Sequence, residues 1–194
     1  MEAAGWQIAR RCHARAFVVC GKGNNAGDGL AAARHLQRWG RLAGVACVDR
    51  EALRGPAAAE AVALEAHGVS IAAKPAFGDS DMIIDALLGT GLTRAPEGVY
   101  ADWIRSLNSA GIPVLAVDVP SGLEADSGKA HDPTVRAATT VTLGLAKPGL
   151  LKHDGPTHAG EVWVADIGVP WDAYRELGIN VPAAVFAGGD AFRL

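Results

Sequence analysis

GKGNNAGDG, residues 21–29, separates two runs of different character in this chain of 194 residues. Before it, AFVVC (16–20) is apolar and β-branched, which is typical of a buried strand. After it, the run from Leu30 to Trp39 has the apolar spacing of a helix. A glycine-rich turn between a strand and a helix lets the backbone approach a ligand closely and points helix N–H groups at an anion. This stretch therefore predicts an α/β fold with an anion-binding loop.

The same stretch satisfies a dinucleotide-binding pattern and adds to it. Gly21, Gly23 and Ala26 match G-x-G-x-x-G/A, the spacing of dinucleotide-binding loops. A loop that bound phosphate alone would not require further polar side chains. Here it also carries two amides and a carboxylate, from Asn24, Asn25 and Asp28.

Strand-like and helix-like runs alternate along the rest of the chain. Alternation of this kind implies β-α-β crossovers, so we expect a Rossmann-like, three-layer α/β/α fold with a mainly parallel, doubly wound sheet. Loops and antiparallel edge pairing are expected over residues 120–160, which are richer in Gly, Pro and Asp. The predicted strands are 16–20, 43–48, 69–72, 82–86, 113–118, 139–144, 162–166 and 183–187, and the predicted helices are 1–12, 27–39, 56–67 and 98–109.

Composition excludes several classes of protein. Hydrophobic residues make up 49% of the chain and the formal net charge is −3, which predicts a packed globule without a broad nucleic-acid surface. No apolar run is long enough for a membrane span, and the first residues lack a secretory apolar region. Cys12, Cys20 and Cys47 form no C-x-x-C pair, which predicts buried free thiols and a cytoplasmic location. The six histidines show no zinc-binding spacing.

Four predicted strands end in glycine-rich polar loops. In a parallel α/β sheet the carboxyl ends of the strands share one edge, where ligands bind, so these loops should meet. They are residues 21–29, 85–93, 118–123 and 143–149.

Each polar residue of these loops also has a purely structural interpretation. Asp28 is in a position to cap the following helix, and Asp85 and Asp118 are each able to stabilise a turn through their own side chains. Ser121 lies in Pro-Ser-Gly-Leu, which is not a nucleophile elbow. Lys147 is either a solvated lysine or a group that neutralises a phosphate. Two aspartates at the ends of two strands favour the functional interpretation.

Taken in order, the motifs resemble the YjeF-type N-terminal domain, the NAD(P)H-hydrate epimerase family. The matching blocks span residues 21–170, which is most of the chain, and include a weaker fifth match at Asp166-Ile167-Gly168-Val169-Pro170. The four principal blocks are GKGNNAGDGLAAARHL (21–36), DALLGTGL (85–92), VDVPSGL (117–123) and TVTLGLAKPGLL (140–151).

The resemblance implies an isomerase of nicotinamide nucleotide repair. Such enzymes interconvert the R and S forms of hydrated NADH and NADPH, bind one potassium ion, and work with a dehydratase that consumes the S form. The implied roles here are catalysis by Asp118, potassium binding by Asn25, Asp85 and Ser121, and substrate binding by Asn24, Asn25, Ala26, Gly27, Asp28, Gly89, Thr90, Gly91, Leu92, Thr93, Arg94, Ala95 and Asp118.

Two departures from the family pattern are visible. The family loop usually reads Asn-Asn-Gly-Gly-Asp, whereas this chain has Ala26, whose Cβ is unfavourable where φ is positive. The family usually has a longer segment before a Met-Glu-x-Ala-Gly stretch, which Met1-Glu2-Ala3-Ala4-Gly5 resembles. We therefore expect a single domain over residues 1–194, shortened at its N-terminus and without a dehydratase domain. Self-association into a homodimer would cover the apolar area that such shortening exposes.

Two other functions fit parts of the sequence. The Gly21-x-Gly23 fingerprint is compatible with a redox enzyme that uses intact NAD, with Asp49 binding a ribose. A non-catalytic YjeF-like scaffold is compatible with the fold alone, and a basic groove on the surface would favour it.

Overall fold

The architecture was analysed in a computed structural model, which describes residues 1–182 and 184–194. One sheet of eight strands has the order β3-β2-β1-β4-β5-β6-β7-β8. Strands β1 to β7 are parallel to their neighbours, and β8 pairs antiparallel with β7 at the edge. The strands are β1 (Ala16–Cys20), β2 (Leu42–Cys47), β3 (Ile71–Ala72), β4 (Met82–Ala86), β5 (Val114–Val117), β6 (Thr139–Leu143), β7 (Glu161–Ala165) and β8 (Ala191–Arg193).

Alternate residues of β1 pack on opposite faces of the sheet. Val18 and Cys20 belong to one apolar cluster, and Phe17 and Val19 belong to another. All five residues of β1 are buried, as expected for a central parallel strand covered by helices on both faces. The continuous apolar run that predicted this strand is therefore a consequence of its two-sided burial.

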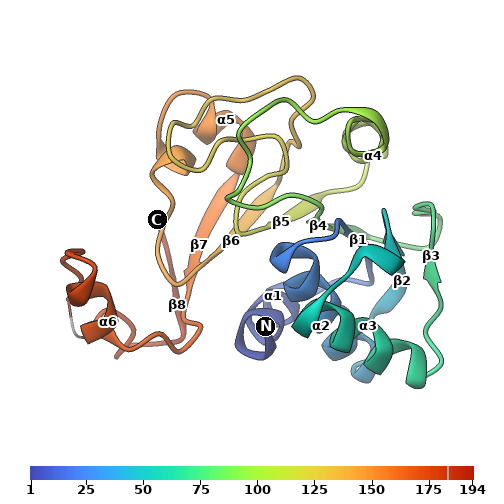
Figure 1. The fold of residues 1–194 in the computed structure, drawn as a ribbon, viewed down its shortest axis with the longest axis horizontal. Helices are drawn as coiled ribbons and strands as arrows, with labels where there is room; N and C mark the ends of the chain where they lie inside the picture. The colour runs from blue at the N-terminus through green and yellow to red at the C-terminus, as the bar shows by residue number, and fades with distance from the viewer. Residues whose placement is uncertain (183) are drawn as a thin grey trace.

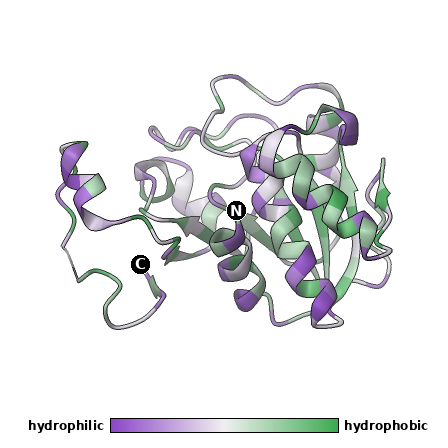
Figure 2. Cartoon of the chain, turned by 60° about the horizontal axis from the view of Figure 1, so that its bottom comes forward, coloured by the Kyte–Doolittle hydropathy of each residue, from purple (hydrophilic) through white to green (hydrophobic). Residues whose placement is uncertain are grey.

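Helices cover both faces of the sheet, as Figure 1 shows. The first cluster packs α1 (Glu2–Arg11), α2 (Asn24–Arg38) and α3 (Gly55–Ala66) on one face. The second packs α4 (Gly98–Ser109) on the other through Trp103, Ile104 and Leu107. A third, smaller cluster joins the loop after β5 to α5 (Gly155–Ala159). Coloured by hydropathy, the strands are the most hydrophobic part of this core (Figure 2). These layers confirm the predicted three-layer α/β/α fold.

Helix α2 lies unusually close to the sheet. A Cβ built on Gly29 would stand 2.4 Å from the Cβ of Ala86 on β4, so only glycine fits at this crossing. A Cβ on Gly21 would stand 2.0 Å from the carbonyl oxygen of Leu87, so the loops after β1 and β4 touch. These two glycines bring the start of α2 against the end of β4.

Most predicted elements are confirmed, with three corrections. Helix α2 begins at Asn24 rather than at residue 27, because residues 24–26 continue into the helix instead of forming a loop. The predicted strand at 183–187 is wrong: residue 183 lies outside the described residues, 184–187 form turns, and the last strand is β8. Two short helices, α5 and α6 (Trp171–Glu176), and the 3₁₀ helices η1 (Arg50–Ala52) and η2 (Pro148–Leu151) were not predicted.

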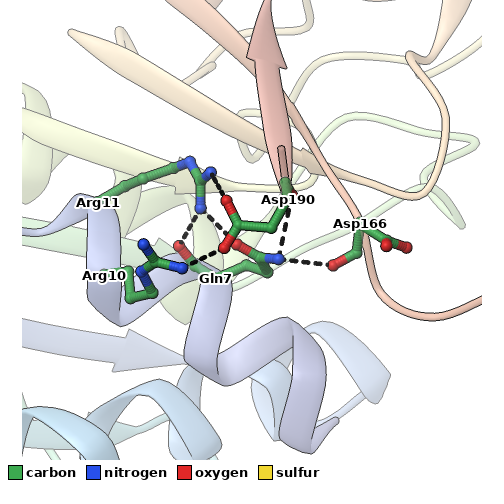
Figure 3. Close-up of polar contacts among 5 residues, drawn as sticks. All are labelled: Gln7, Arg10, Arg11, Asp166 and Asp190. Atoms are coloured by element: carbon green, nitrogen blue, oxygen red, sulfur yellow. Dashed lines mark hydrogen bonds and ion pairs between the residues drawn. The ribbon is translucent and has the colours of Figure 1, made fainter. Parts of the chain in front are cut away.

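A polar cluster fastens the C-terminal segment to α1 (Figure 3). The amide of Gln7 donates to the carbonyl oxygens of Asp166 and Asp190, at 2.9 and 3.1 Å. Arg10 and Arg11 both form ion pairs with the Asp190 carboxylate. Beyond this cluster, α6 buries none of its residues and projects from the body of the molecule in both views (Figures 1 and 2).

Candidate functional site

A pocket of about 700 Å³ opens at the carboxyl ends of the central strands. It lies where the strand order reverses, between β1 and β4, which is where open α/β sheets bind ligands. The loops after β1, β4 and β5 all contribute to it. This arrangement confirms that the first three polar loops meet at one edge of the sheet.

Most predicted substrate-binding residues line this pocket. Ala26 and Gly27 do not: Ala26 is fully buried in the core, and Gly27 faces the side chain of Met1. Ala26 lies within α2 and has no positive φ, so its Cβ introduces no backbone strain. The predicted residues that line the pocket are Asn24, Asn25, Asp28, Gly89, Thr90, Gly91, Leu92, Thr93, Arg94, Ala95 and Asp118.

The N-terminus of α2 opens onto the pocket. Gly23 is the N-cap and provides no side-chain cap, while the first helical hydrogen bond of the loop runs from the N–H of Gly27 to the Gly23 carbonyl. The preceding N–H groups of the first turn have no partner within the helix and suit an anion. The sequence predicted that the helix, and with it the N–H groups that face an anion, would begin at residue 27. In the structure the helix begins at Asn24, so the N–H groups of that earlier turn face the pocket.

The three predicted potassium ligands converge around the backbone of Leu88. The Asn25 amide donates to the Leu88 carbonyl at 3.0 Å, and the Leu88 N–H donates to the Ser121 hydroxyl at 2.8 Å. That hydroxyl donates in turn to an oxygen of Asp85 at 2.6 Å. The sequence-distant loops after β1, β4 and β5 are thereby joined into one polar cluster.

Asp85 provides the carboxylate of this cluster and is fully buried. Its exposed fraction is 0%, and burial raises its pKa to about 6, although hydrogen bonds from Ser121 and Leu87 oppose the shift. The hydrogen bond from the Leu87 N–H to Asp85, at 3.2 Å, is the turn contact expected of a structural aspartate. Asp85 therefore stabilises its own turn and also accepts hydrogen bonds from the N–H and the hydroxyl of Ser121.

Asp118 ends β5 with an unusual backbone. Its φ of 68° lies in the left-handed region, which non-glycine residues adopt rarely, and residues with this strain often occur at functional sites. Its N–H still donates to the Val141 carbonyl of β6, at 2.8 Å. The reversal directs the side chain toward the end of β6, where its Oδ1 accepts from the N–H of Leu143 at 3.1 Å and the hydroxyl of Thr142 at 3.2 Å.

Asp28 is a second carboxylate of the pocket. Its side chain is 16% exposed, and burial raises its pKa to about 6. Asp118 adds to this rise, whereas the amino group of Met1, 3.8 Å away, and the ammonium of Lys147 oppose it. Because α2 begins four residues earlier, Asp28 does not cap the helix. Asp28 therefore binds a proton more readily than an exposed aspartate does.

Several residues that line the pocket were not predicted. Lys22 and Gly23 belong to the quoted loop, and their position beside Asn24 was the available signal. Glu97 and Tyr100 belong to the start of α4, whose apolar pattern indicated only a core helix. Leu87, Leu88 and Pro96 complete this set.

Lys147 and Asp49 do not lie where the sequence suggested. Lys147 forms an ion pair with the Asp118 carboxylate instead of standing free for a phosphate. Asp49 is absent from the pocket lining, and it caps η1 by accepting from the N–H of Ala52 at 3.0 Å. Asp49, which occupies the position expected of a ribose-binding acid, therefore has a structural role in this chain.

Within the described ranges, the chain has neither a cluster of metal-binding side chains nor a membrane-spanning helix. Residues 1–182 and 184–194 contain no cluster of three or more His, Cys, Asp or Glu side chains arranged to hold a metal ion. None of the helices in these ranges is both long and apolar enough to traverse a bilayer. The three cysteines are buried and free, as predicted.

Comparison with known proteins gives consistent matches. The family model "YjeF-related protein N-terminus" matches residues 1–149. The NAD(P)H-hydrate epimerase of Dehalogenimonas lykanthroporepellens is 36% identical over 100% of this chain and 82% of its own length. The epimerase of the same name from Limosilactobacillus fermentum is 42% identical over 77% of this chain and 73% of its own length.

Longer relatives and a solved structure also match. The bifunctional NAD(P)H-hydrate repair enzyme Nnr of Thermofilum pendens is 38% identical over 88% of this chain, which spans only 36% of that enzyme. The crystal structure of the yeast protein ynu0, YNL200c, superposes with a TM-score of 0.78 over 100% of this chain and 88% of that one. At 22% identity, this likeness supports the fold alone.

Proposed function

This chain belongs to the family of YjeF-related protein N-termini, and on that basis we propose that it is an epimerase that interconverts the R and S forms of hydrated NADH and NADPH. One observation of the site carries the proposal. Eleven of the thirteen substrate-binding residues that the family resemblance implies, which come from three segments distant in sequence, line one pocket at the switch point of the sheet. A pocket of about 700 Å³ is within the range of small-molecule and cofactor sites.

We assign the charged and the reacting parts of the dinucleotide to different regions of the pocket. The first turn of α2 offers N–H groups to phosphate oxygens, and the loop after β4 adds the hydroxyls of Thr90 and Thr93. Lys22 and Arg94 add two positive charges to the lining. The carboxylates of Asp28 and Asp118 would repel phosphates, so the hydrated nicotinamide ring belongs beside them.

Asp118 is the proposed catalytic acid and base. Epimerisation requires that one bond at the hydrated carbon break and re-form, while a proton leaves and returns at a group on that carbon. A positioned carboxylate performs both proton transfers. Asp118 lines the pocket, and the left-handed turn at the end of β5 fixes the direction of its side chain.

Potassium is the proposed resident ion. Asn25, Asp85 and Ser121 supply amide, carboxylate and hydroxyl oxygens, the donor types that hard cations prefer. The fully buried Asp85 carboxylate carries a cost of desolvation that a neighbouring cation would offset. A bound ion would supply electrostatic rigidity to three loops, while substrate binding and proton transfer are assigned to the chain's own residues.

A dehydratase is the proposed functional partner. Several relatives are bifunctional NAD(P)H-hydrate repair enzymes, of which this chain spans about a third, as in the 36% of the Thermofilum enzyme. An epimerase alone only equilibrates two forms, so repair requires a second activity that removes one of them. We assign that activity to a dehydratase specific for the S form.

A coupled assay tests the proposal. Purified R-form hydrate is incubated with an S-specific dehydratase, and the return of NADH absorbance is followed with and without this protein. We expect rapid regeneration of NADH only when both proteins are present. Regeneration at the uncatalysed rate would contradict the proposal, and hydride transfer from added NADH would favour the redox alternative.

A further inference from the structure

We propose that Lys147 is a positioning residue for Asp118: its ammonium holds one carboxylate oxygen so that the other faces the substrate. The proposal rests on the proposed epimerase function, and it assigns Lys147 a role in catalysis rather than in phosphate binding.

The contacts of Lys147 are directed and local. Its Nζ forms an ion pair with Oδ1 of Asp118 and donates to the carbonyl oxygen of Leu143 at 2.8 Å. The side chain is 20% exposed and that of Asp118 is 15% exposed, so the pair is largely desolvated. Lys147 immediately precedes Pro148, the first residue of η2, which restricts the backbone that carries it. Because two partners hold the ammonium, it interacts with the Asp118 carboxylate and is not free to bind a phosphate.

The donors around Asp118 act on one oxygen only. Oδ1 receives the Lys147 ammonium together with the Leu143 N–H and the Thr142 hydroxyl. Within residues 1–182 and 184–194, no hydrogen bond reaches Oδ2. Since Asp118 lines the pocket, Oδ2 is the oxygen available to a substrate. All three donors lie in residues 142–147, which comprise the end of β6 and the loop that follows it. This one segment therefore determines the orientation of the carboxylate.

The balance of charges in the pocket also supports the assignment of Lys147 as a positioning residue for Asp118. Asp28 and Asp118 both line the pocket, and each disfavours the charge of the other. Lys147 is close enough to both to oppose this repulsion. Removing its charge would leave the carboxylate of Asp118 less firmly oriented and the two aspartates in uncompensated repulsion. A small displacement of a catalytic group is enough to slow a reaction by about 100-fold.

The competing role for Lys147 is neutralisation of a substrate phosphate, and kinetics separate the two. Lys147→Met removes the charge and keeps most of the aliphatic stem, and Lys147→Arg keeps the charge. For a positioning residue, we expect Lys147→Met to lower kcat by about 10- to 100-fold with little change in KM, and Lys147→Arg to recover part of the loss. A phosphate ligand would instead raise KM at an unchanged kcat.

Two matched lysines calibrate the measurement. Lys22→Met removes a cation of the pocket lining that has no carboxylate partner among the ion pairs of the described residues, and we expect it to raise KM. Lys152→Met removes an exposed lysine at the end of η2 that does not line the pocket, and we expect wild-type kinetics. Thermal melting of each variant establishes that it is folded, and Lys147→Gln replaces Lys147→Met if the latter is not.

The decisive arm is a double-mutant cycle with Asp118→Asn. If Lys147 acts through Asp118, adding Lys147→Met to Asp118→Asn causes no further loss of kcat. Multiplicative losses, a pure KM effect, or wild-type kinetics in Lys147→Met would each overturn the inference. A wild-type protein that does not epimerise the hydrate at all would instead overturn the proposed function, and this inference would fall with it.

Discussion

At the scale of single residues, the account depends on Asp118, where backbone strain and side-chain position coincide. A left-handed φ is unfavourable for most L-residues, and Asp and Asn tolerate it better than others because their short polar side chains bond locally. Here the strain places the carboxylate between β5 and β6, where it accepts from the N–H of Leu143. The turn is therefore maintained by the same side chain that it presents to the pocket.

Asp118→Asn tests the catalytic role without disturbing the turn. Asparagine tolerates the left-handed region and still accepts from Leu143, but it is not basic. We expect kcat for hydrate epimerisation to fall about 100- to 10,000-fold, the usual contribution of a general acid or base, with a melting temperature close to that of the wild type. Steady-state kinetics and thermal melting measure these two quantities. A folded variant with near-wild-type turnover would remove Asp118 from the catalytic role.

Asp28 makes a prediction about pH and stability. Its pKa is raised to about 6 in the folded state, so the folded protein holds this proton more tightly than the unfolded chain, whose pKa is near 3.8. The resulting stability is fully present below pH 3.8 and is lost as the pH rises to about 6. Asp28→Asn does not titrate, so between pH 4 and pH 7.5 it should gain about 2 kcal/mol relative to the wild type.

Denaturant unfolding at a series of pH values measures this gain. The free energy of unfolding of wild type and variant is compared at each pH, so that shared titrations cancel. Asp102→Asn in α4 is the control, because that side chain is 76% exposed and lies outside the pocket. A constant difference between wild type and Asp28→Asn across this pH range would contradict the assigned shift.

At the scale of elements, the sequence predicts those strands and helices whose bounds are determined by a local pattern of residues. Strand β1 (Ala16–Cys20) was predicted at its observed bounds because a strand buried on both faces requires a continuous apolar run. Strand β8 was missed because a three-residue antiparallel edge is defined by its pairing with β7, not by its own composition. The start of α2 was missed because asparagines and glycines usually indicate a loop, whereas packing of Gly29 against Ala86 decided the structure.

The site shows the same division between local and tertiary information. The loops after β1, β4 and β5 were predicted to meet, because parallel topology alone brings strand ends together. The pairing of Lys147 with Asp118 was not predicted, because it depends on the left-handed turn at Asp118. Tyr100 was not predicted as a pocket residue, because the pattern of α4 does not reveal that its first turn borders the pocket.

Gln7 is one of three side chains that join helix α1 to the C-terminal segment, and the effect of its loss is measurable. Gln7 is 5% exposed and donates to two carbonyl oxygens, those of Asp166 and Asp190. Gln7→Ala leaves both acceptors without that donor, so we expect the free energy of unfolding to fall by about 1–3 kcal/mol. Gln37→Ala, at an exposed position of α2, is the matched control and should change it by less than about 0.5 kcal/mol. Equal effects of the two substitutions would show that the hydrogen bonds of Gln7 do not stabilise the fold.

At the scale of the whole molecule, the proposed ion connects three loops that are far apart in sequence. Asn25, Asp85 and Ser121 come from the ends of β1, β4 and β5, so a cation bound by all three would favour the folded state. At potassium concentrations of 10 to 100 times Kd, the expected stabilisation is about 1–3 kcal/mol relative to a bulky organic cation. Thermal melting in the two salts measures it.

Asp85→Asn provides the specific comparison for the ion. The substitution keeps the side-chain volume but removes the only carboxylate of the cluster, so the difference between the two salts should disappear even if the variant is less stable in both. Asp102→Asn should retain that difference, because it lies on the exposed side of α4. Stabilisation by potassium that persists in Asp85→Asn would exclude this cluster as the binding site.

The central claim, that this fold epimerises hydrated nicotinamide nucleotides, is tested most directly by the approach to equilibrium from both sides. Pure R-form and pure S-form hydrates are incubated separately with the protein alone, and chromatography follows the ratio of the two forms. The account predicts that both samples reach the same ratio at a rate proportional to protein concentration, whereas Asp118→Asn leaves each at the uncatalysed rate. Wild-type samples that retain their starting forms for as long as protein-free controls would contradict it.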